Sequence, residues 1–69
     1  MSDKEYLEYV GMEFRLERTR QRITQQELAN RSGVVYQTIQ KIENARNPAN
    51  ILTLKKLADT LGKPLKDFL

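Results

Sequence analysis

Two short helical patterns separated by a single glycine occupy residues 24–44, whose sequence is TQQELANRSGVVYQTIQKIEN. Thr24 and Glu27 have the spacing of a capping box, in which the Thr hydroxyl accepts from the amide of residue 27 and the Glu carboxylate accepts from the amide of Thr24. Ile23 and Leu28, on either side of this cap, have the spacing of a hydrophobic staple. These signals predict a helix that begins directly after Thr24.

The glycine marks where this first helix ends. Gly33 follows the last periodic residues, near Ser32, and glycine adopts the left-handed conformation of a helix end at little cost. A second helix is predicted over about residues 36–44, with Ile39 and Ile42 on its inward side.

The N-terminal third also shows helical spacing. Three apolar residues recur at intervals of four: Tyr6, Val10 and Phe14. They predict a helix over about residues 4–21, although Gly11 weakens its first half. An alternative is that the helix begins near Val10, which leaves residues 1–9 as an N-terminal extension.

The C-terminal third predicts two further helices. Asn50 is a plausible N-cap, and an apolar stripe follows it at Ile51, Leu54, Leu57, Ala58 and Leu61. Gly62 ends this helix, and Pro64 suits the first turn of a short last helix that carries Leu65, Phe68 and Leu69. Strand-like alternation is missing from the sequence, so we predict an all-α chain of five helices, with residues 1–69 forming one domain.

The composition excludes several classes of function. The 69 residues include no Cys and no His, so the usual zinc ligands and the commonest general base are missing. No paired nucleophile and base, phosphate loop or metal-ligand set is visible, and we therefore predict no enzymatic activity, no metal and no cofactor. No run of about 18 apolar residues or secretory signal is present, which favours a cytoplasmic protein without a membrane partner.

Charge is unevenly distributed along the chain. The formal net charge is +3. Basic residues crowd the middle, at Arg15, Arg18, Arg20, Arg22, Arg31, Lys41 and Arg46, whereas acidic residues gather near the start, at Asp3, Glu5, Glu8 and Glu13. This pattern indicates one positive face, which is compatible with nucleic acid without establishing it.

Residues 24–44 meet the physical requirements of a helix-turn-helix, whose first helix crosses the DNA backbone and whose second enters the major groove. Ala29 is small enough for close contact between the helices, and Gly33 supplies the turn. The inward apolar anchors are Leu28, Val34, Ile39 and Ile42. The outward residues of the second helix are Tyr36, Gln37, Thr38, Gln40 and Lys41, which can hydrogen-bond to base edges; the Tyr36 ring can also contact thymine methyl groups.

These residues resemble the Cro and phage-repressor helix-turn-helix family, also called the XRE family. The resemblance covers residues 10–69. It includes Val10-Gly11, the single Arg18, and the runs TQQELANRSGV, IQKIEN, LKKLADTLG and KPLKDFL.

The resemblance implies a five-helix, lambda-repressor-like domain that binds a palindromic double-stranded DNA operator as a symmetric homodimer, in a prokaryote or phage. Base contacts then fall to Tyr36, Gln37, Gln40 and Lys41. Phosphate contacts fall to Gln25, Gln26, Thr38, Arg46 and Asn47. A buried structural ion pair is implied between Arg18 and Glu43, because each would be costly to bury alone.

Three departures from the family pattern concern the second helix and the loop after it. Val35 replaces the usual Ser or Thr cap, which costs about 1 kcal/mol unless another group caps the helix. Ala45 stands where the family commonly has Gly, so Asn44 or a changed turn must end the helix. The Asn47-Pro48 pair comes one residue early, which puts the loop contacts of Arg46 and Asn47 in question.

Other interpretations stay open. Tyr36 can simply cover the core, and Gln37, Gln40 and Lys41 can form a solvated face. Arg15, Arg20 and Arg22 are expected to be solvated or to face phosphates weakly. The fold can also serve as a protein-interaction module, as in an antitoxin or bridging factor. As a regulator, the chain can be a phage repressor, a Cro-like protein, a restriction–modification controller or an excised N-terminal domain.

Overall fold

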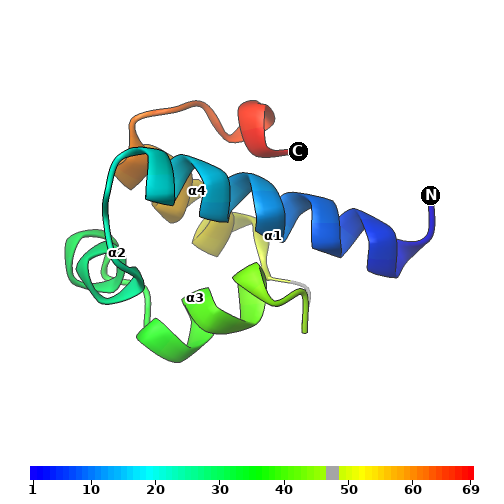
Figure 1. Cartoon of the computed structure of the whole chain (residues 1–69), viewed down its shortest axis with the longest axis horizontal. Coiled ribbons are helices and arrows are strands. Elements are labelled where there is room, and N and C mark those ends of the chain that lie inside the picture. Colours follow the sequence, from blue (N-terminus) through cyan, green and yellow to red (C-terminus); the bar gives the residue numbers. More distant parts are fainter. Residues whose placement is uncertain (47–48) are drawn as a thin grey trace.

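The computed structural model describes residues 1–46 and 49–69 of the chain (Figure 1). Its elements are α1 (Asp3–Arg20), α2 (Gln25–Ser32), α3 (Tyr36–Glu43), α4 (Ile51–Leu61) and the 3-10 helix η1 (Leu65–Phe68). The predicted all-α class is confirmed, and the fifth predicted helix is a single 3-10 turn. No helix among the described residues is long and apolar enough to cross a membrane.

Helix α1 begins with a capping box that was not predicted from the sequence. The Ser2 hydroxyl accepts from the Glu5 amide at 3.1 Å, and a Glu5 carboxylate oxygen accepts from the Ser2 amide at 3.0 Å. Residues 3–9 therefore form the first turns of α1, and the helix continues through Gly11 without interruption.

Gly11 is the position where α1 approaches the end of α3 most closely. A β-carbon built there would lie 2.4 Å from the carbonyl oxygen of Ile42 and 3.2 Å from that of Glu43. Both neighbours are backbone atoms at the end of a helix, so neither can move without shifting α3. The glycine that lowers the helical propensity of α1 is thus what allows α1 and α3 to touch.

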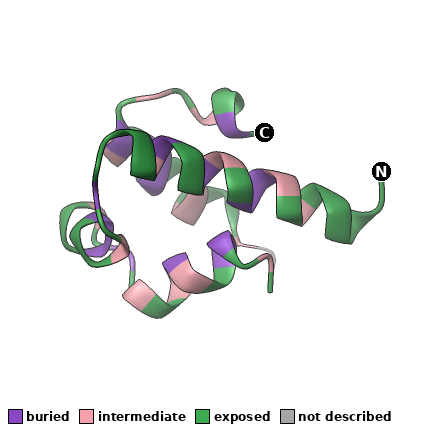
Figure 2. Cartoon of the chain, in the orientation of Figure 1, coloured by how far each residue is buried: buried purple, intermediate pink, exposed green. Residues whose placement is uncertain are grey.

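The apolar core lies between the helices, where the buried stripes of α1, α3 and α4 face inward (Figure 2). Helix α1 contacts α3, α4 and η1, while α2 contacts α3 and α4. The Phe14 and Phe68 rings stack with their centroids 4.1 Å apart and their planes at 4°. This stacking fixes the C-terminal turn against the first helix.

The predicted stripe of α4 is only partly buried. Leu57, Ala58 and Leu61 are in the core and Leu54 packs against it, but Ile51 is 59% exposed. The expectation that Ile51 faces inward is wrong, because the first turn of α4 extends beyond the core that the other helices cover.

Helix α3 ends in a Schellman motif whose left-handed residue is Ala45. The Arg46 amide donates to the Lys41 carbonyl at 2.9 Å, and the Ala45 amide donates to the Ile42 carbonyl at 3.1 Å. Ala45 has φ 57°, whereas Asn44 has φ −95°. Ala45, and not Asn44, therefore takes the left-handed conformation, which a glycine would adopt at lower cost.

We predict that Gly11→Ala destabilises the protein by about 1–3 kcal/mol, because the added methyl group overpacks the contact between α1 and α3. Chemical unfolding monitored by circular dichroism measures the change. Met12→Ala, at the neighbouring exposed position of the same helix, is the control and should leave stability nearly unchanged. Helix propensity alone predicts that Gly11→Ala stabilises by about 1 kcal/mol, and that result would contradict the packing argument.

We predict that Ala45→Gly stabilises the protein by about 1 kcal/mol, because glycine adopts the left-handed conformation without the strain of alanine. The greater conformational entropy that glycine gives the unfolded chain offsets only part of this gain. The midpoint of thermal unfolding should rise. Asn44→Gly, one residue earlier at negative φ, should bring no such gain. Equal effects of the two substitutions would show that Ala45 is not strained.

Candidate nucleic-acid interface

Helix α2 presents its N-terminus through the predicted capping box. The Thr24 hydroxyl accepts from the Glu27 amide at 3.0 Å, and Glu27 Oε1 accepts from the Thr24 amide at 3.1 Å. Hydrogen bonds from Thr24, first from its backbone and then from its side chain, lower the pKa of Glu27 below its ordinary value. The carboxylate form makes this cap, so its contribution to stability is present at neutral pH and is lost as the pH falls through the lowered pKa.

The turn between α2 and α3 places the two helices against each other. Ala29 is buried in the core, and the Gly33 amide donates to the Ala29 carbonyl at 3.0 Å. Gly33 has φ 78°, in the left-handed region. Val34 is buried directly after it, so α3 starts from a fixed point on the core.

Helix α3 divides into an inner and an outer face. Ile39, Ile42 and Glu43 are buried, whereas Gln37 and Lys41 are exposed. A shallow hollow on the outer side is lined by Gln37, Gln40, Lys41, Asn44 and Arg46. Asn44 was not among the predicted site residues, although it lies three residues after Lys41 and seven after Gln37. Extending the outward stripe by one turn would have found it.

A second hollow lies at the start of α3. It is lined by Arg18, Thr24, Gln25, Gln26 and Tyr36. Tyr36 is half-buried and packs against the core, and its hydroxyl accepts from Gln40 Nε2 at 3.1 Å. The ring therefore partly covers the core, while its hydroxyl and Gln40 form a hydrogen-bonded pair one turn apart.

A buried carboxylate joins α1, α2 and α3 beneath these hollows. The Glu43 side chain has no exposed surface, and Arg18 donates to both of its oxygens, at 2.8 and 2.9 Å. Gln25 Nε2 donates to Glu43 Oε1 at 3.1 Å, and Arg15 Nε lies 3.4 Å from the same oxygen. Arg18 also donates to the Ile23 carbonyl at 2.8 Å. The contacts of Gln25 and Arg15 with Glu43 were not predicted from the sequence, because no short-range spacing connects residues of three different helices.

The other predicted phosphate-contacting residues are spread around these hollows. Gln26 Nε2 donates to Asn30 Oδ1 at 3.0 Å along α2. Thr38 is half-buried on the flank of α3 and lines neither hollow. Arg46 is exposed at the end of α3. Asn47 and the Asn47-Pro48 pair lie outside the described residues.

The N-terminus of α3 lacks a side-chain cap. Val35 occupies the N-cap position with φ −60° and ψ 137° and makes no capping hydrogen bond. The described residues contain no group of three acidic, His or Cys side chains that could hold a metal ion.

Two solved structures share this fold. The restriction-modification controller protein C.AhdI from Aeromonas hydrophila superposes with a TM-score of 0.88 and 24% identity, over 91% of this chain and 96% of that chain. An HTH_3 family transcriptional regulator from Vibrio cholerae gives a TM-score of 0.90 and 21% identity, over 97% of this chain but only 38% of that chain.

The sequence comparisons identify the family. No curated protein sequence showed significant similarity to this chain. The helix-turn-helix family model HTH_3 matches residues 14–68, a span that contains α2, the Gly33 turn, α3 and α4 entirely. The earlier resemblance to the XRE type is thereby confirmed, and the chain belongs to the HTH_3 helix-turn-helix family of DNA-binding regulators.

Proposed function

We propose that the protein is a sequence-specific transcriptional regulator that binds double-stranded DNA, with α3 as its recognition helix in the major groove. The observation that carries this proposal is the outer face of α3, which is polar and has no acidic residue. Its side chains line one hollow and Tyr36 lines a second, and both hollows are lined by amide, hydroxyl and cationic side chains. An acidic or apolar outer face would have favoured a protein-interaction module.

Base recognition falls to the polar groups of α3. Gln37 and Gln40 each offer an amide donor and acceptor, the pair of groups that binds adenine in the major groove, and Lys41 offers donors that suit guanine. The hydrogen bond between Gln40 and Tyr36 restricts both side chains before DNA arrives. Asn44, in the same hollow as Lys41, is a further candidate.

Phosphate contacts fall to the groups around α3. The N-terminus of α2 carries backbone donors and a positive dipole end that favour an anion. The Gln25 amide has two N–H donors, so its bond to Glu43 leaves one free for a phosphate. Gln26, Thr38, Arg46 and Asn47 complete the proposed set of phosphate contacts, which position the helix without reading sequence.

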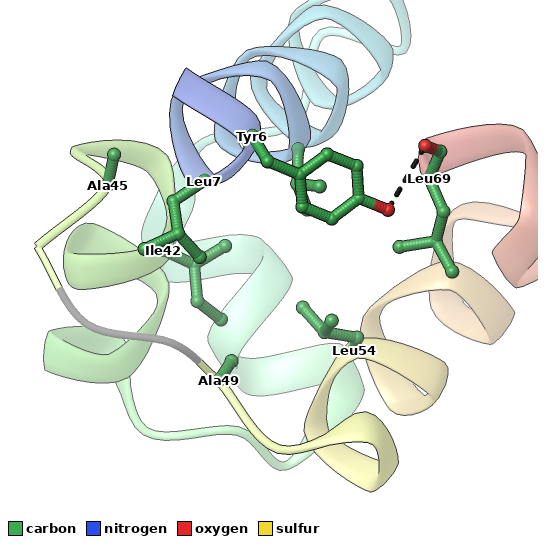
Figure 3. Close-up of a pocket in the computed structure, with 8 residues that line it drawn as sticks. Tyr6, Leu7, Ile42, Ala45, Ala49, Leu54 and Leu69 are labelled. Atoms are coloured by element: carbon green, nitrogen blue, oxygen red, sulfur yellow. Dashed lines mark hydrogen bonds between the residues drawn. The ribbon is translucent and has the colours of Figure 1, made fainter. Parts of the chain in front are cut away.

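We further propose that the protein binds DNA as a symmetric dimer. An apolar groove of about 140 Å³ lies between the start of α1, α4 and the C-terminus (Figure 3). Tyr6 reaches across its side, where the hydroxyl donates to the Leu69 carbonyl at 3.2 Å. Ile51 and Leu52, in the first turn of α4, are 59% and 67% exposed. Ile51 and Leu52 do not line the groove, and we propose that a second copy covers both the groove and these two side chains. Such a dimer would supplement the small core of a 69-residue chain.

We predict that purified protein selects a defined motif from a random DNA pool and that base and phosphate contacts respond differently to substitution. Gln37→Ala or Lys41→Ala should cost roughly 1–3 kcal/mol on the selected operator and relax preference at one base pair. Arg46→Ala should weaken binding to all sequences alike and reduce the salt dependence of affinity by about one phosphate contact. Binding titrations at several salt concentrations separate the two effects.

Lys56→Ala, at an exposed position of α4 that lines neither hollow, is the charge-matched control for Lys41→Ala. If Gln37→Ala and Lys41→Ala keep the wild-type preference at every base pair, α3 does not read the bases. If no sequence is enriched at all, the interaction-module alternative is favoured.

We predict that Leu52→Glu weakens dimer formation while leaving the fold intact, because a carboxylate suits the first turn of a helix but not an apolar interface. Light scattering with size-exclusion chromatography measures the oligomeric state. Footprinting of the wild-type protein should show two half-sites about 34 Å apart, or a multiple of that spacing.

Met12→Glu adds the same charge to an exposed apolar position of α1 and should leave the oligomeric state unchanged. A single half-site, or a dimer that tolerates Leu52→Glu, would contradict the proposed interface.

A further inference from the structure

Val35 combines two unfavourable features at the start of the recognition helix. It makes no capping hydrogen bond, and its apolar side chain is 62% exposed. Valine is among the poorer residues at an N-cap, where a side-chain oxygen normally accepts from the first turn. The neighbouring Val34 is the residue that fills the core, so packing does not require a second valine at position 35.

The other α-helices of the described chain show that the backbone at Val35 is ordinary. Their caps, Ser2, Thr24 and Asn50, have φ between −73° and −76° and ψ between 158° and 165°. Each accepts from an amide three residues later, at 3.1, 3.0 and 2.9 Å. Val35 lies in the same extended region, at φ −60° and ψ 137°. A Ser at this position would therefore be placed to cap α3, and the missing cap follows from the side chain alone.

A single exposed valine elsewhere on a protein surface needs no explanation, but Val35 is exposed beside the proposed DNA-binding surface. It directly precedes Tyr36 and Gln37, the first groove-facing residues of the proposed recognition helix. The sequence from Leu28 to Ile42 contains no acidic residue, so the residues next to Val35 along the chain place no carboxylate that would repel a phosphate backbone. Residues that break a local rule at a functional surface commonly do so for function.

We propose that Val35 is a specificity-determining residue that contacts the 5-methyl group of a thymine in the major groove. This inference rests on the proposed function. The thymine methyl is the one apolar group that a base pair presents in that groove, and apolar side chains recognise it by contact. Burial of about one methyl group changes affinity roughly fourfold. In the complex, α3 would lack an N-cap hydrogen bond at Val35 and have an apolar contact with DNA there instead.

The test combines one substitution in the protein with one in the DNA. Each thymine of the selected operator is replaced in turn by deoxyuridine, which lacks only the 5-methyl group. Wild-type protein should lose about fourfold in affinity per half-site at one position. Val35→Ser should lose about the same on the thymine operator and be indifferent to deoxyuridine at that position. Because the hydroxyl restores a cap, Val35→Ser should also raise the melting temperature by about 4–8 °C.

Two variants make the interpretation specific. Val35→Ala removes the γ-methyl groups without adding a cap, so it should lose deoxyuridine sensitivity with no rise in melting temperature. Met12→Ala removes an exposed apolar side chain from α1 and should keep full deoxyuridine sensitivity. If the wild-type protein is indifferent to deoxyuridine at every position, or if Val35→Ser keeps full sensitivity to deoxyuridine, this inference is overturned while the proposed function is not. Failure of the selection to enrich any sequence would overturn the proposed function and this inference together.

Discussion

The buried Glu43 carboxylate is the interaction on which the arrangement of the helices depends. It belongs to α3, yet it accepts hydrogen bonds from Arg18 of α1 and Gln25 of α2. A carboxylate without exposed surface is costly to bury unless charged donors surround it, and the same holds for the largely buried Arg18. One side chain thereby fixes the recognition helix relative to the helix before it and to the long first helix. It also holds the amide that we propose for phosphate binding.

Helix α3 has eight residues, too few to be stable by itself, so tertiary contacts must hold it. Those contacts come from the buried Ile39 and Ile42, from Glu43, and from the close approach of Gly11. They offset unfavourable local features at both ends of the helix, namely the uncapped Val35 and the left-handed Ala45. Because these contacts hold the inner face in place, the residues of the outer face are not needed for packing. They can therefore be polar groups that bind a partner.

Signals that act within one turn were predictable from the sequence. The capping box of Thr24, the Asn50 cap, and the left-handed Gly33 and Gly62 follow from local chemistry, and the structure has all of them. Features that join distant residues were missed or misjudged. Gly11 was read as a weakness of α1 because the carbonyl that requires it lies some thirty residues later in the chain. Ile51 fits the apolar period of α4 but lies beyond the surface that the other helices cover.

By itself, the sequence determined the all-α class, the ends of α2 and α4 and the polar outer stripe of α3, because hydrophobic period, caps and glycine positions are local properties. Only the tertiary structure decided that Gln25 and Arg15 join Arg18 at Glu43, which glycine permits contact between helices, and which apolar residues stay exposed at the groove and at Val35. These depend on how elements distant in sequence come together. Residue spacing within a single helix carries no information about that packing.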